Sequence, residues 1–275
     1  MEQSLANEGI ISDLAVCFAH RGARGHAPEN TLLAFALAFE LGADAVECDV
    51  RRSHDGHLVV IHDDTLDRTT NGKGPVAGKS FAELRALDAG MNRRIPQFIP
   101  ALEEVLELVR RKDGQINLEI KGHTFEESIA TAVAMEPVLR ALPEARRSRV
   151  LVSSFEHPAI AYLKERLPWL RLGALFGREW RGQDLVAPAL ALGAEAIHPE
   201  VGLLSEESVL AAHLAGLRVN VWTANSWARI HRLLRWRVDG IFSDLPERII
   251  ILRRLRCGSI GDSSRHAGWI NDADR

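Results

Sequence analysis

Cysteine is scarce in this chain of 275 residues, which contains only Cys17, Cys48 and Cys257. An odd number of cysteines without a Cys-x-x-Cys pair favours neither a disulfide framework nor a thiolate zinc site. Long hydrophobic runs are also missing, because no stretch reaches the roughly 18 apolar residues that a membrane-spanning helix needs. We therefore expect reduced thiols and no membrane span.

The sequence also lacks a recognisable signal peptide and an excess of positive charge. Its first fifteen residues include Glu2, Glu8 and Asp13, and they have neither a basic beginning nor a sustained apolar segment. The formal net charge of -3 provides no broad electropositive surface for nucleic acid. These absences predict a cytoplasmic protein that does not bind nucleic acid, in which any anion site is local.

The order of elements repeats along the chain. Hydrophobic residues make up 46% and charged residues 26%, which is ordinary for a globular protein of this length. Short apolar strands alternate with amphipathic helices and predict an α/β protein with a (β/α)8 TIM barrel. We expect the barrel domain at 14–250, with a small insertion at about 63–100 after the second strand, and a flexible polar tail at 258–275. The eight strands are centred near Phe18, Val46, Leu118, Leu151, Leu172, Ile197, Val219 and Ile241.

Ionisable residues follow or interrupt several of these strands. Glu47 and Asp49 lie two residues apart in a strand and share one face, so their like charges favour a cation between them. The turn at Asp55-Gly56 returns the chain as a second strand that ends at His62. For this stretch alone, a solvated pair of acids beside a hairpin histidine is an equal alternative.

A later strand carries a third carboxylate beside a lysine. Asn117, Glu119 and Lys121 alternate with apolar residues and share one face. Glu119 would complete a set of hard oxygen ligands, and Lys121 would offer a point charge to an anionic oxygen. An edge strand with a surface Glu-Lys pair is the alternative.

The first strand ends at His20 and Arg21, where parallel α/β folds place their functional sites. Asn30 or Thr31 can cap the following helix, and Glu29 and Asn30 could equally line the site. In the insertion, Arg68 is a candidate for anion contact or a solvated loop arginine.

Together, the strand ends predict one site of defined chemistry. Three carboxylates without a cysteine or multi-histidine cluster favour one divalent cation, Mg2+ or Ca2+, over zinc. An arginine and a lysine suit a phosphodiester, and two histidines can share general-base and general-acid roles. Trp222 offers a wall for the substrate or belongs to the core. The collected strand-end residues are His20, Arg21, Glu47, Asp49, His62, Glu119, Lys121, Ser153, Phe155, His198 and Trp222.

The order and spacing of several motifs resemble a known enzyme family. The motifs are His20-Arg21-Gly22, Pro28-Glu29-Asn30-Thr31, Glu47-x-Asp49, Asp55-Gly56, His62-Asp63, Leu66-x-Arg68-Thr69-Thr70, Glu119-x-Lys121, Ser153-Ser154-Phe155, Asp239-Gly240 and Ser243-Asp244. From about Phe18 to Pro246 they resemble the glycerophosphodiester phosphodiesterase family, particularly its cytoplasmic bacterial members.

This resemblance implies a TIM barrel with a small insertion after the second strand and a metal-dependent hydrolase of glycerophosphodiesters. It implies that the cation is bound by Glu47, Asp49 and Glu119. It further implies that His20 and His62 are the acid/base pair and that Arg21 and Lys121 contact the phosphate. The products would be sn-glycerol 3-phosphate and an alcohol such as choline or ethanolamine.

Several alternatives stay open at this point. Lysophospholipase D-type cleavage of lysophospholipids is one, and a non-catalytic phosphate-binding barrel is another. The sequence does not decide whether a cyclic phosphate forms or whether the barrel self-associates into a homo-oligomer. Cys48, between the two strand carboxylates, makes the site a candidate target for soft metals.

Overall fold

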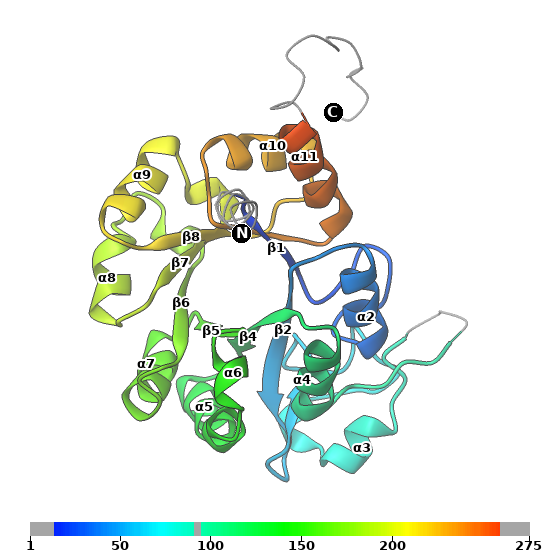
Figure 1. Cartoon of the computed structure of the whole chain (residues 1–275). Helices are drawn as coiled ribbons and strands as arrows, with labels where there is room; N and C mark the ends of the chain where they lie inside the picture. The colour runs from blue at the N-terminus through cyan, green and yellow to red at the C-terminus, as the bar shows by residue number, and fades with distance from the viewer. Residues whose placement is uncertain (1–13, 91–94, 259–275) are drawn as a thin grey trace.

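The pairing of the strands confirms the expected barrel. The computed structural model describes residues 14–90 and 95–258. In this part of the chain, nine strands form one sheet in the order β1-β9-β8-β7-β6-β5-β4-β2-β3, and β1 also pairs with β2. Every neighbouring pair is parallel except β2 with β3, so the other eight strands close into a (β/α)8 barrel (Figure 1). These strands are β1 (Val16–Ala19), β2 (Ala45–Arg52), β4 (Gln115–Ile120), β5 (Val150–Ser154), β6 (Arg171–Phe176), β7 (Ala196–Pro199), β8 (Arg218–Val221) and β9 (Gly240–Ser243).

Helices surround the barrel (Figure 1). Their starting points follow local capping chemistry: at the start of the first described helix, Thr31 Oγ1 accepts the Ala34 N–H at 3.2 Å. Of the two capping candidates, Thr31 is therefore the cap. The helices are α2 (Leu32–Glu40), α4 (Leu102–Arg111), α5 (Phe125–Arg140), α6 (Glu144–Arg147), α7 (His157–Arg166), α8 (Val186–Ala191), α9 (Glu206–Leu214), α10 (Trp227–Arg235) and α11 (Pro246–Gly258), with 3-10 turns η2 (Arg178–Trp180) and η3 (Val201–Leu203).

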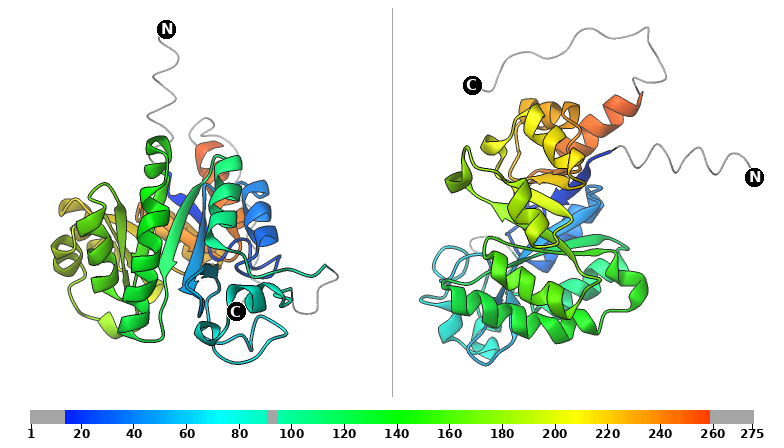
Figure 2. Two further views of the ribbon diagram at one scale, coloured as in Figure 1. Left: turned by 90° about the horizontal axis from the view of Figure 1, so that it is seen from below. Right: turned by 90° about the vertical axis from the view of Figure 1, so that its left-hand side faces the viewer.

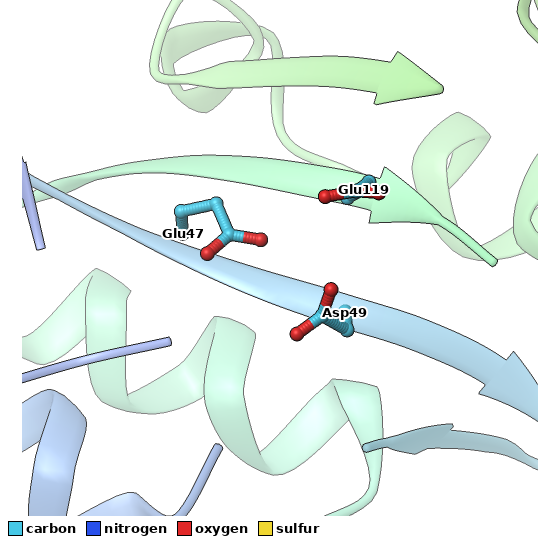
Figure 3. A group of neighbouring side chains, drawn as sticks. All are labelled: Glu47, Asp49 and Glu119. Atoms are coloured by element: carbon cyan, nitrogen blue, oxygen red, sulfur yellow. The ribbon is translucent and has the colours of Figure 1, made fainter. Parts of the chain in front are cut away.

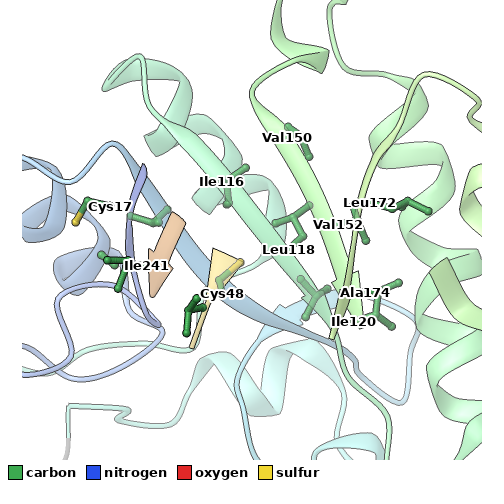
Figure 4. Packing of buried hydrophobic residues seen from close by; sticks show 14 of the residues in the cluster. Cys17, Cys48, Ile116, Leu118, Ile120, Val150, Val152, Leu172, Ala174 and Ile241 are labelled. Carbon is green, nitrogen blue, oxygen red and sulfur yellow. The ribbon is translucent and has the colours of Figure 1, made fainter. Parts of the chain in front are cut away.

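The main hydrophobic core lies between the strands and the helices (Figure 4). Since side chains alternate along a strand, every second strand residue faces this core. Cys48 packs there with Cys17, Leu118 and Ile241, on the face opposite to Glu47 and Asp49. Burial, together with these two carboxylates, raises the pKa of the Cys48 thiol well above its ordinary value. Cys48 is therefore a core residue and does not support the expectation of a soft-metal site.

The other strand residues fill the barrel interior. Phe18 stacks on Phe242 with ring centroids 4.5 Å apart. His198 is fully buried, and a Cβ atom at Gly173 would lie 2.3 Å from its ring, so this position leaves room only for glycine. Ser153 is also fully buried and accepts a hydrogen bond from Asn117 Nδ2 at 2.9 Å. His198 is thus an interior residue and not the edge residue that the sequence suggested, because inward positions along the strands fill the barrel before the open edge is reached. Ser153, by contrast, pairs in register with Glu119 and lies beside the carboxylates.

An excursion follows β2 and has its own small core. It contains β3 (Leu58–Val60), which pairs with β2 antiparallel, η1 (Val76–Gly78) and α3 (Phe81–Arg85). It lies at the end of the barrel toward which β2 runs (Figure 2). Its buried apolar side chains are Val59, Ile61, Leu66, Val76, Leu84, Ala89 and Ile99.

The last described helix, α11, follows the eighth barrel strand as the (β/α)8 order requires, although the sequence alone did not give its bounds. It buries Ile249 and Ile250, and Arg253 pairs with Asp44. Residues 259–275 of the expected flexible tail and residues 1–13 lie outside the described part of the chain. Within residues 14–90 and 95–258, no helix combines the length and the hydropathy needed to cross a membrane.

Candidate active site

Three carboxylates converge where β2 and β4 run side by side (Figure 3). Parallel register places Asp49 beside Glu119, and Glu47 lies two residues before Asp49 on the same face. One oxygen of each carboxylate lies within 4.8 Å of the others, and Glu47, Asp49 and Glu119 are 2%, 0% and 8% exposed. The solvated-acid alternative is therefore wrong, because these acids are buried together.

The three buried carboxylates of the cluster repel one another. Burial and the charges of Asp49 and Glu119 raise the pKa of Glu47 well above its ordinary value. Burial would also raise the pKa of Asp49, but Lys121 and Arg21 hold it below the usual range. The pKa of Glu119 is raised by burial although Lys121 opposes this effect. An additional cation would relieve this repulsion.

Arg21 reaches the cluster from the loop after β1. Its backbone N–H donates to Glu47 Oε2 at 2.8 Å, and its Nε lies 3.3 Å from Asp49 Oδ2. Arg21 and Gly22 have φ values of 55° and 80°, and a Cβ atom at Gly22 would lie 2.7 Å from Ala34. The glycine therefore permits the tight turn that directs Arg21 back toward the carboxylates.

Lys121 approaches the same carboxylates directly after β4. Its Nζ lies 3.3 Å from Asp49 Oδ1 and forms an ion pair with Glu119. The ammonium also lies 5.7 Å from the ring centroid of Phe155. Burial would lower the pKa of Lys121, but Glu119 and Asp49 raise it above its ordinary value, so the side chain is a fixed positive charge.

The two histidines lie at strand ends and each contacts an aspartate. His20 Nδ1 lies 2.7 Å from Asp244 Oδ1, and His62 Nδ1 lies 2.6 Å from Asp63 Oδ1. Burial lowers the pKa of His20 despite its hydrogen bond to Asp244. For His62, burial is again the main cause and the pKa falls to about 4. Both imidazoles therefore favour the neutral form and leave Nε2 for chemistry.

Comparison with known proteins identifies the family of this chain. Residues 20–248 match the Glycerophosphoryl diester phosphodiesterase family. A Glycerophosphodiester phosphodiesterase from Caldanaerobacter subterraneus subsp. tengcongensis is 39% identical over 244 residues, covering 86% of this chain and 96% of the relative. The chain belongs to the glycerophosphoryl diester phosphodiesterase family.

Further relatives of this phosphodiesterase family agree with the assignment. A Glycerophosphodiester phosphodiesterase from Bacillus altitudinis is 37% identical over 242 residues, covering 86% of this chain and 97% of the relative. The solved structure of an Oleispira antarctica phosphodiesterase in complex with the product sn-glycerol-3-phosphate has a TM-score of 0.81 at 31% identity. The match covers 88% of this chain and 98% of that chain.

The site also has contacts from Asn30, Asp63 and Asp244, to which the sequence assigned no definite role. Asn30 Nδ2 donates to Asp49 Oδ2 at 2.7 Å, so Asn30 does contact the cluster. Asp63 and Asp244 hold the histidines. Both occur in the quoted motifs, as His62-Asp63 and Ser243-Asp244, but no spacing rule links Asp244 to His20 across the chain.

Trp222 contacts both an interior residue of the barrel, His198, and the exposed residue Phe155. Its Nε1 donates to the His198 carbonyl at 2.7 Å, and its ring contacts Phe155 edge to face with centroids 5.5 Å apart. Trp222 is half-buried, whereas Phe155 is 42% exposed. Phe155 is therefore the more exposed of these two rings.

A groove of about 400 Å³ lies beside the carboxylate cluster and is lined in part by His62, Lys121, Phe155 and Glu156. A second groove of about 490 Å³ shares Lys121 with it and extends toward η1. The structure thus has open space next to His62 and Lys121.

Proposed function

We propose that the protein hydrolyses glycerophosphodiesters to sn-glycerol 3-phosphate and an alcohol such as choline or ethanolamine. The proposal rests on the buried cluster of Glu47, Asp49 and Glu119. The positive side chains of Arg21 and Lys121 flank this cluster, and two histidines lie at the same end of the barrel. The product complex of the Oleispira antarctica relative supports the same reaction.

We infer that one divalent cation, Mg2+ or Ca2+, is bound by Glu47, Asp49 and Glu119. Glu47 Oε1 is buried and has no hydrogen-bond partner among the described residues. Three carboxylate oxygens match the preference of hard cations, so the residues fit such an ion. When bound, it would polarise the phosphoryl group and offset the charge that develops on it.

The two positive side chains would bind the anionic phosphodiester. Arg21 and Lys121 both lie 3.3 Å from Asp49, from different elements of the barrel. Each can therefore reach a different non-bridging phosphate oxygen of a substrate placed at the cluster. Fixed positive groups stabilise the transition state because they need no reorganisation as negative charge builds up.

The two histidines would divide the proton transfers. Their Nδ1 atoms lie against Asp244 and Asp63, so that Nε2 is the atom which exchanges a proton with the substrate. His62 borders the groove of about 400 Å³ and His20 does not. We therefore assign the alcohol to this groove and proton removal to the neutral Nε2 of His20. Proton delivery is assigned to His62, which must first take up a proton at Nε2 and would then be an imidazolium paired with Asp63.

Lysophospholipase D-type activity depends on whether the site accepts an acyl chain. Within the excursion, Ile99 is buried in its small core, whereas Ile95 and Phe98 are 67% and 51% exposed. Exposed apolar side chains in the excursion are compatible with a lipid, so both substrates belong in the test. The cytoplasmic location and the oligomeric state stay predictions.

The test measures release of glycerol 3-phosphate from glycerophosphocholine by metal-stripped protein, before and after addition of Mg2+ or Ca2+. We expect turnover that depends on the cation and is lost in Glu119→Ala and His20→Ala. Glu107→Ala serves as the matched control, because Glu107 is an exposed helix carboxylate that pairs with Arg110. Faster choline release from lysophosphatidylcholine would favour the lipid substrate, and binding without turnover at every cation concentration would indicate a non-catalytic barrel.

A further inference from the structure

Arg68, in the loop after His62, joins two carboxylates on different parts of the site. Its Nε and Nη2 donate to Asp63 Oδ2 and Oδ1 at 2.6 and 2.9 Å. Its Nη1 and Nη2 donate to Glu29 Oε2 and Oε1 at 2.9 and 2.7 Å. A planar guanidinium with two bidentate partners fixes both carboxylates in one plane. The Arg68 side chain is 46% exposed, as a loop arginine is expected to be, but both of its carboxylate partners hold it in place.

Each of these carboxylates also holds a side chain assigned to the reaction. Asp63 Oδ1 lies 2.6 Å from His62 Nδ1, and Glu29 Oε1 accepts a hydrogen bond from Arg21 Nη1 at 2.9 Å. The side chains of Asp63 and Glu29 are 22% and 11% exposed and that of Arg68 is 46% exposed, so the two carboxylates are partly shielded from solvent whereas Arg68 is not. Burial would raise the pKa of Glu29, but Arg68, Arg21 and Arg24 lower it to about 2, and it remains a carboxylate.

We propose that Arg68 is a positioning residue that couples the orientation of the proposed acid His62 to that of the phosphate-binding Arg21. The hydrogen-bonded chain runs from His62 through Asp63, Arg68 and Glu29 to Arg21. This inference rests on the proposed function for the roles of its two ends. Arg68 does not itself line the groove of about 400 Å³, but its partner Asp63 does, so its effect on turnover passes through its two partners.

The shape of the guanidinium is essential to this role. A lysine would keep the positive charge, but its ammonium is a point charge that cannot bind two carboxylates side by side in the same plane. Arg68→Lys therefore separates positioning from charge. Small misplacements of reacting groups cost about 10²-fold in rate, so the effect is measurable.

The kinetic experiment compares Arg68→Ala, Arg68→Lys, Asp63→Asn and Glu29→Gln. With glycerophosphocholine and saturating Mg2+, we expect Arg68→Ala to lower kcat/KM by about 10²-fold and Arg68→Lys to stay closer to alanine than to the wild type. Asp63→Asn should lower mainly kcat, because it acts on His62. Glu29→Gln should raise mainly KM, because it acts on Arg21. In double variants with Arg68→Ala, each effect should be less than additive.

Arg85→Ala is the matched control. Arg85 lies in the same excursion and binds Glu104 through Nη1 and Nη2, with Nη2 at 2.8 Å from Glu104 Oε1, away from the site. This variant removes an arginine of the excursion that also binds a carboxylate through two nitrogens but contacts neither Asp63 nor Glu29. It therefore measures the activity that is lost when the excursion alone is perturbed. We expect kcat and KM within about twofold of the wild type.

A second readout does not depend on activity. The ¹⁵N chemical shifts of the His62 imidazole report which ring nitrogen carries the proton, and we expect Arg68→Ala to change them while the shifts of His20 stay constant. Wild-type protein that is inactive on every glycerophosphodiester would refute the proposed function, and the shifts would still test the positioning. If Arg68→Ala matches Arg85→Ala in kcat, KM and His62 shifts, or if Arg68→Lys is fully active, the positioning role is wrong.

Discussion

Replacing Glu47 by glutamine should stabilise the metal-free protein and weaken its response to a divalent cation. The substitution preserves the shape of the side chain and removes one negative charge from the buried cluster. The amide oxygen can still accept the Arg21 N–H, which now lies 2.8 Å from Glu47 Oε2. The amide NH2 group would take the place of Glu47 Oε1, which lacks a hydrogen-bond partner among residues that the structure describes, and could donate to a neighbouring carboxylate.

The magnitude follows from the spacing of the carboxylates. Two unit charges 4.8 Å apart, the largest separation between the cluster oxygens, repel each other by about 3.5 kcal/mol at an effective dielectric constant of about 20. Arg21 offsets part of this repulsion, and the raised pKa of Glu47 allows a proton to relieve more of it. We therefore expect a gain of about 1–2 kcal/mol, which corresponds to about 2–8 °C in Tm for a chain of this size.

Thermal unfolding with and without Mg2+ or Ca2+ tests this reasoning. A cation at about 100 times its Kd should stabilise the wild type by about 2.7 kcal/mol, and the variant by less because an amide is a weaker ligand than a carboxylate. Since a raised carboxyl pKa means that the folded state binds the extra proton, the advantage of the metal-free variant should grow as pH rises above the ordinary carboxyl range. Glu107→Gln, at an exposed carboxylate, is the control. A metal-free variant less stable than the wild type, or an equal cation response in both, would refute the argument.

Two further predictions concern histidines. Burial lowers the pKa of His198 to about 3. As pH falls, His198 therefore takes up a proton in the unfolded chain before it does so in the folded protein, and the folded protein loses stability. In urea unfolding, His198 should lower the free energy of unfolding by about 2 kcal/mol between pH 7 and pH 5. This loss should be absent in His198→Gln, and the same pH dependence of the free energy of unfolding in both proteins would contradict the prediction. Asp244→Asn should lower kcat by about 10²-fold and move the His20-dependent part of the pH-rate profile to lower pH, because the Asp244 carboxylate raises the His20 pKa. An unchanged profile would show that Asp244 does not orient His20.

Much of the site was predictable because strand periodicity is local. Glu47 and Asp49 share a face whatever the rest of the chain does, and Glu119 and Lys121 do so in their own strand. Parallel strands in a barrel end at one edge, so these residues were expected to meet. The same reasoning failed for His198, since periodicity assigns a face of the sheet but does not give the depth at which a side chain lies inside the barrel.

Contacts between distant segments could not be predicted in this way. His20 and Asp244 are 224 positions apart and meet only because β1 pairs with β9 when the barrel closes. The bonds from Arg68 to Glu29 depend on how the excursion folds back over the loop after β1. No local pattern carries this information, because it depends on the path of the chain through many intervening elements.

The sequence by itself determined the order of β and α elements, the face of each strand that carries the acids, and the motifs shared with the phosphodiesterase family. These features depend on side-chain periodicity and turn chemistry within a few residues. The tertiary structure alone decided that the three acids are buried within 4.8 Å of one another, that Asp244 and Asp63 contact His20 and His62, and that Arg68 joins Asp63 to Glu29. Burial and long-range hydrogen bonds arise only when the barrel closes, and they set the charge and orientation of every group in the site.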